Sequence, residues 1–115
     1  MRYFFSLKID AKPEQVDKIT HVLGVAPDYP QVAWGYKLIV QDNAYTNFVD
    51  CFLDILENKY DKLKRIGIRR EDISVWMIYE YEEQCNMEFT PRDMKRLGDN
   101  GITFCISCYE KSVIE

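Results

Sequence analysis

The stretch from residue 73 to residue 109 constrains the fold most, because strand, turn and helix signals follow one another in it in a fixed order. Residues 73–81 are apolar on both faces, which is typical of a strand inside a sheet. Residues 84–89 alternate apolar and polar side chains and predict a second strand that returns from a turn. Pro91 suits the first turn of a short helix, and residues 102–109 predict a closing strand.

The part of the chain before this unit predicts two strands and two helices. Residues 1–9 and residues 32–40 alternate apolar and polar side chains, as strands with one buried face do. Residues 13–23 predict a helix that begins with a proline and is followed by a glycine, which adopts the left-handed stop. Residues 44–66 place apolar side chains at helical spacing and predict one long helix with a weak point near Asn58.

The predicted order of elements is β-α-β-α-β-β-α-β, within a single α+β domain over residues 1–115. Strand–helix–strand crossovers are right-handed, and two of them with an extra hairpin strand predict a mixed five-stranded sheet. We expect the helices to pack mainly on one face of this sheet, in a ferredoxin-like or related arrangement.

The composition favours an acidic globular domain. The chain has 115 residues, of which 47% are hydrophobic and 30% are charged, and its formal net charge is −4. This balance opposes nucleic-acid binding through phosphate neutralisation, and it is compatible either with a basic protein partner or with solubility alone. The N-terminal residues lack signal-peptide features and no apolar run has the length of a membrane span, so we expect no membrane association and a cytoplasmic location.

Cys105 and Cys108 have the spacing of a zinc knuckle or a redox motif. In the predicted strand, however, residues three apart point to opposite faces of the sheet. Cys85 and His21 are of the right residue types to complete a metal site with this pair. Nothing in their spacing, however, predicts that they lie close to it. We therefore interpret the cysteines as reduced structural thiols, and we expect neither a metal nor a cofactor.

Acidic residues flank the predicted hairpin turn, namely Glu80, Glu82, Glu83 and Glu88, with Tyr81 among them. One hypothesis is an acidic tip that meets a basic protein surface. The simpler interpretation is a set of solvated charges that protects a hairpin edge from aggregation. A carboxylate-based enzyme that uses Glu80, Glu82 or Glu88 ranks lower, because catalytic carboxylates face each other across a cleft and no spacing predicts one.

Trp34 and Tyr36 on one predicted strand and Trp76 on another are candidates for the walls of a ligand pocket, although sheet core is the commoner role for such rings. A basic segment lies between residues 59 and 70, near the end of the predicted long helix. Cations at a helix C-terminus interact favourably with the helix dipole, which explains the segment without a ligand.

Both ends of the chain carry recognisable patterns. The C-terminal pattern is a strand, a proline-led short helix and a strand ending in an aromatic residue, over residues 84–109. The N-terminal pattern is a strand, the helix that begins at Pro13 and a Leu-Gly-x-x-Pro turn at residues 23–27. Together they resemble a small bacterial family known only as a domain of unknown function. The resemblance implies a soluble, single-domain bacterial protein and supplies no catalytic residue.

The first functional hypothesis is a non-catalytic interaction module of a bacterial cytoplasm, for example an immunity-type protein that masks a basic partner. The alternative is a regulatory domain that binds a small molecule with Trp34, Tyr36 and Trp76, and the third is the carboxylate-based enzyme. The protein is expected to be a monomer or a homodimer, the latter through edge pairing of residues 84–89.

Overall fold

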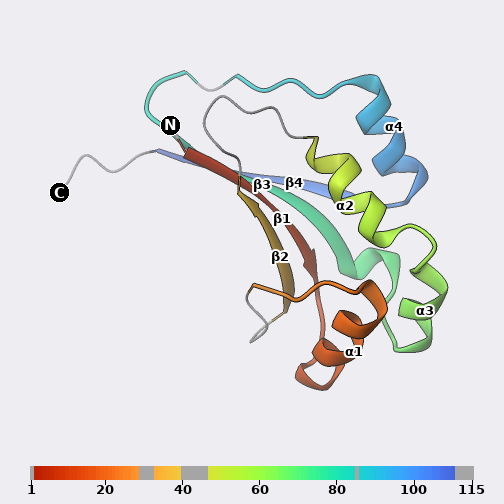
Figure 1. The fold of residues 1–115 in the computed structure, drawn as a ribbon. Coiled ribbons are helices and arrows are strands. Elements are labelled where there is room, and N and C mark those ends of the chain that lie inside the picture. Colours follow the sequence, from red (N-terminus) through yellow and green to blue (C-terminus); the bar gives the residue numbers. More distant parts are fainter. Residues whose placement is uncertain (1, 29–32, 40–46, 85, 111–115) are drawn as a thin grey trace.

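The computed structural model describes residues 2–28, 33–39, 47–84 and 86–110, and Figure 1 shows their arrangement. In chain order the elements are β1 (Arg2–Ile9), α1 (Pro13–Leu23), β2 (Trp34–Ile39), α2 (Phe48–Leu56), α3 (Tyr60–Arg65), the short 3-10 helix η1 (Arg70–Asp72), β3 (Ile73–Tyr81), α4 (Pro91–Asp99) and β4 (Thr103–Glu110).

The described strands form a mixed four-stranded sheet with the order β2-β1-β3-β4. β1 pairs antiparallel with both β2 and β3, whereas β4 pairs parallel with β3 after the α4 crossover. The α+β class and the mixed sheet are therefore confirmed. The predicted five-stranded sheet is wrong for the described residues. The first half of the chain also differs from a ferredoxin-like split β-α-β unit, because β1 and β2 are direct antiparallel neighbours.

The predicted strand over residues 84–89 is an extended connection between β3 and α4 wherever the structure describes it. Because β3 and β4 are parallel, the chain has to return along the sheet before β4 begins. Met87 and Phe89 are half-buried on this path and pack against the core, whereas Asn86 and Glu88 are exposed. The alternation in the sequence thus marks an extended chain lying along the core, which needs no strand partner.

The predicted long helix is two helices, α2 and α3, and its residues 44–46 lie outside the described part of the chain. Asn58 separates the two helices with a φ of 68°. Asparagine enters this left-handed region more readily than most residues do, because its side chain forms local hydrogen bonds. The predicted weak point near Asn58 is therefore a complete break, after which α3 begins at Tyr60.

Two proline-led helices begin where the sequence predicts. α1 starts at Pro13 and is followed by Gly24, whose φ of 77° is left-handed. α4 starts at Pro91 after Thr90, whose hydroxyl accepts a hydrogen bond from the Asp93 N–H at 3.2 Å. Such caps pair backbone groups that a helix end leaves without an internal partner.

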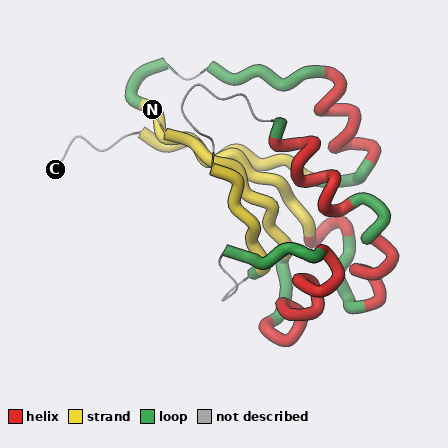
Figure 2. The backbone as a smooth tube through the Cα atoms, viewed as in Figure 1, coloured by secondary structure: helices red, strands yellow, loops and turns green. Residues whose placement is uncertain are grey.

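The described helices gather on one side of the sheet, and the hydrophobic core lies between the two layers (Figures 1 and 2). Alternate strand residues point into this core, among them Leu7 of β1, Trp34 of β2 and Val75 of β3, all with 0% exposure. Phe52 of α2 is equally buried on the helical side. The helices of the described residues are too short or too polar to cross a membrane.

Candidate functional site

The sheet face opposite the helices, here called the open face, carries apolar side chains across several strands. Ile39, Phe4 and Ile78 are lateral neighbours on β2, β1 and β3. Trp76 lies on the same face, two residues before Ile78 on β3. Tyr109 of β4 is also on this face, beside Glu80 near the C-terminal end of β3. Ile39 is 67% exposed and Tyr109 is 46% exposed. An exposed apolar group of this kind marks a contact surface more often than an isolated exposed leucine does.

Two lysines rest on the aromatic rings of the open face. The Lys37 Nζ lies 4.5 Å from the centre of the Phe4 ring, and the Lys8 Nζ lies 5.7 Å from the centre of the Trp76 ring. The Trp76 indole N–H also donates to the Ser74 hydroxyl at 2.8 Å. These contacts keep the rings ordered while the lysine ammonium groups stay near solvent.

The acidic residues predicted as a binding tip lie at the end of β3. Glu80 lies on the open face beside Tyr109 of β4, and the exposed residues Glu82 and Glu83 follow directly. Tyr81 lies on the opposite, helix-covered face and packs against the core. The acidic charges therefore adjoin the apolar end of the open face, although the described residues around them form no hairpin.

Glu88 is separate from this acidic group. It is exposed between Met87 and Phe89, whose half-buried side chains pack against the core on the helix side of the sheet. The structure thus brings together Glu80, Glu82 and Glu83 at one end of β3 and leaves Glu88 on the path to α4.

Trp34 and Tyr36 belong to the core rather than to a pocket shared with Trp76. Trp34 has 0% exposure, and its indole N–H donates to the Thr20 hydroxyl at 3.0 Å. Tyr36 is half-buried and stacks on Trp34 with the ring centres 6.3 Å apart. In the sheet Tyr36 pairs with Leu7, whereas Trp76 pairs with Ser6, the residue before Leu7 on β1. The rings therefore lie on opposite faces and do not line one cavity.

Cys105 and Cys108 lie in β4, and their side chains point to opposite faces as expected. Cys105 pairs with Trp76 on the open face, and Cys108 pairs with Tyr79 on the helix-covered face. Cys85 lies outside the described residues, and the residues that the structure does describe contain no group of three or more potential metal ligands.

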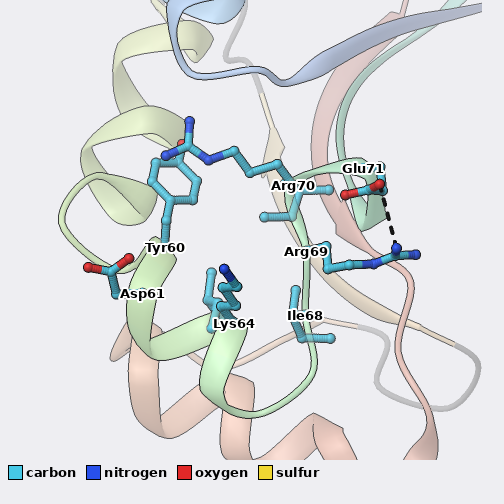
Figure 3. A pocket seen from close by; sticks show the side chains of 9 residues that line it. Tyr60, Asp61, Lys64, Ile68, Arg69, Arg70 and Glu71 are labelled. Atoms are coloured by element: carbon cyan, nitrogen blue, oxygen red, sulfur yellow. Dashed lines mark ion pairs between the residues drawn. The ribbon is translucent and has the colours of Figure 1, made fainter.

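A cleft of about 440 Å³ opens between α3 and the segment that leads through η1 into β3 (Figure 3). Leu63, Ile68 and Ile73 form its apolar side, and each is at most 2% exposed. Its polar side comes from the basic segment between residues 59 and 70, which the sequence analysis attributes to the helix dipole alone. The cleft is therefore a feature that sequence reasoning missed, and its only sequence signal is that group of cations.

Arg70 is fixed at the upper wall of the cleft. The carbon at the centre of its guanidinium lies 4.0 Å from the centre of the Tyr60 ring, and its Nη1 donates to the Asn100 carbonyl at 2.9 Å. The Tyr60 hydroxyl donates to the Asn100 side-chain oxygen at 2.7 Å. Burial raises the pKa of Tyr60 to about 12, so the phenol stays neutral at physiological pH and keeps donating this hydrogen bond.

Lys64 and Arg69 are the other two cations around the cleft. Lys64 makes no hydrogen bond or ion pair with another residue of the described ranges, and Figure 3 shows its ammonium group directed into the cavity. Arg69 points outward and pairs with Glu71 at 3.6 Å and with Asp72 at 3.9 Å. Asp61 completes the charged lining from α3.

A separate ionic cluster joins α4 to α2. The Arg96 guanidinium contacts Asp50 at 2.5 Å, Glu57 at 2.8 Å and Asp54 at 2.9 Å. Hydrogen bonds from Arg92 and Arg96 hold the pKa of Asp50 below its usual range, and Arg96 does the same for Glu57. Because every member has its partner in the cluster, we assign this network to helix packing.

No family model, no curated protein and no solved structure matches this chain.

Proposed function

We propose that this protein is a non-catalytic interaction module that binds a basic protein through the open face and its acidic end. The supporting observation is that the apolar row of Ile39, Phe4 and Ile78 adjoins Glu80, Glu82 and Glu83. An immunity-type protein that masks a basic partner is the form of this function that we favour. Its bacterial origin and cytoplasmic location are part of the same proposal.

The two halves of the surface contribute in different ways. Apolar area that leaves solvent contact supplies most of the binding free energy, at about 25 cal/mol per Å² before the cost of ordering is subtracted. Acidic residues at the rim speed association with a basic partner and disfavour acidic ones. The net charge of −4 acts in the same direction over a longer range.

The test combines cross-linking with charge reversal. A photo-cross-linking amino acid at Ile39 should capture a basic protein in the native host, and the same group at the exposed Lys18 of α1 should not. With that protein purified, the Glu82→Lys, Glu83→Lys double variant should bind about tenfold more weakly at low salt.

The matched control reverses two exposed charges of α1 with the variant Glu14→Lys, Asp17→Lys. It has the same net charge as the first variant and should keep wild-type affinity. Equal losses in both variants would show that only net charge matters, and capture of the same protein from Lys18 would place the contact elsewhere. Either result rejects the proposed surface.

A further inference from the structure

We propose that the cleft between α3 and η1 binds a small organic anion that carries an apolar body. This site lies on the helical side of the molecule, and the inference does not depend on partner binding at the open face.

The charge of the cleft selects for an anion. Among its lining residues Lys64, Arg69 and Arg70 are cationic, and Asp61 and Glu71 are anionic. Arg69 and Glu71 already pair with each other at 3.6 Å, so Lys64 and Arg70 face the cavity against the single carboxylate of Asp61. In a chain with a net charge of −4, this excess of positive charge is local to the cleft.

Arg70 is held in position before any ligand arrives. Its guanidinium stacks on Tyr60 and gives one hydrogen bond to the Asn100 carbonyl, as described above. A guanidinium has five N–H donors, and no other described residue accepts from it. A group that is fixed in this way loses little side-chain entropy when it binds a carboxylate or a phosphate.

Lys64 supplies the second contact from the opposite wall. It stands one helical turn after Tyr60 on α3, so both side chains project from the same side of that helix. Figure 3 shows the Lys64 ammonium group below the Tyr60 ring and the Arg70 side chain, with the cavity between them. An anionic group in that space has a cation on either side.

The rest of the cleft determines the body of the ligand. The lining of the cleft is polar and apolar in similar measure, and Leu63, Ile68 and Ile73 are packed beneath it, each at most 2% exposed. The volume of about 440 Å³ lies in the range of small-molecule pockets, which is about 300–1,000 Å³. A compact aromatic or branched aliphatic anion satisfies both sides, whereas an inorganic anion contacts only the polar one.

The experiment compares three aromatic probes of similar shape by amide chemical-shift titration of the whole protein. Benzoate and phenyl phosphate should shift the amide signals of residues 60–64 and 69–71, and the neutral benzamide should bind at least about tenfold more weakly because it lacks the charge-assisted contacts. The ratio of the benzoate and phenyl phosphate affinities distinguishes a carboxylate ligand from a phosphate ligand. Inorganic phosphate should bind more weakly than phenyl phosphate.

The variants test the assigned cations. Lys64→Gln should weaken benzoate binding about tenfold, whereas Lys62→Gln, which changes another exposed lysine of α3 outside the cleft, should leave it unaltered. Glu71→Gln should tighten binding, because it removes a carboxylate from the lining of the cleft and one of the two ion pairs of Arg69. Equal affinity for benzoate and benzamide, equal effects of the two lysine variants, or shifts confined to other residues would each overturn the proposal.

Discussion

Trp34 and Trp76 show how strand position decides the role of one residue type. Trp34 points toward the helices, has no exposed surface and gives its indole hydrogen to Thr20. Trp76 points to the open face and stays half-buried under Lys8. The sequence predicts that both lie on strands, but the face that each one uses depends on register and on which side receives the helices.

We therefore expect truncation of the two tryptophans to have unequal effects. Trp34→Ala should lower the free energy of unfolding by about 3–5 kcal/mol, because it leaves a cavity in a close-packed core. Trp76→Ala should lower it by clearly less, because that ring is in partial contact with solvent. Urea denaturation followed by circular dichroism measures both changes, and equal losses would contradict the assignment of the two faces.

The cleft shows why a site can escape sequence reasoning at the residue scale. Tyr60 and Lys64 are one helical turn apart, which the sequence does predict. Arg70 reaches them only because the chain turns after α3, and Asn100 comes from the far end of α4. Such a meeting depends on tertiary packing, so only the cations themselves were visible in the sequence.

At the scale of elements, the sequence predicts the ends of helices correctly but does not predict which strands pair. Pro13, Gly24 and Pro91 act within a few residues of their own positions, and the helix ends that they predict are confirmed. The alternation over residues 84–89 reports only that one side of an extended chain contacts apolar atoms. It contains no information about a neighbouring strand, so the predicted hairpin is wrong for the residues that the structure describes.

Amide hydrogen exchange distinguishes the extended connection from a strand. The amides of Glu88 and Phe89 should exchange quickly, because no residue in the described part of the chain gives them a ladder hydrogen bond. The amides of Val75 and Met77 should exchange slowly, because β3 has strand neighbours on both sides. Comparable protection of the amides in the two segments would contradict the extended connection and support the predicted fifth strand.

At the scale of the whole molecule, Arg96 connects the α4 crossover to the first half of the chain through α2. The pKa values of Asp50 and Glu57 are lower in the folded protein than their unfolded values of 3.8 and 4.5. This contribution to stability is complete above the unfolded values and is lost as the pH falls through the lower folded values.

Arg96→Met should therefore reduce the free energy of unfolding at neutral pH. The difference from wild type should narrow as the pH falls below about 4, because the carboxylates of both proteins then become protonated. Urea denaturation at a series of pH values measures this convergence.

Lys95→Met is the matched control for Arg96→Met. It removes the ion pair between Lys95 and Asp99, whose side chains are 76% and 62% exposed respectively. The change in stability should therefore be small at every pH. A difference between Arg96→Met and wild type that stays constant down to acidic pH would show that lost packing, rather than the carboxylates, explains the effect.

The central place of β1 has a consequence for how the chain is made. β1 is synthesised before both of its neighbours, β2 on one side and β3 on the other, and its pairing with β3 runs to Glu80. The apolar residues of β1 therefore lack one neighbouring strand until β3 has been synthesised, and during that time they are exposed to chaperones and to unwanted association.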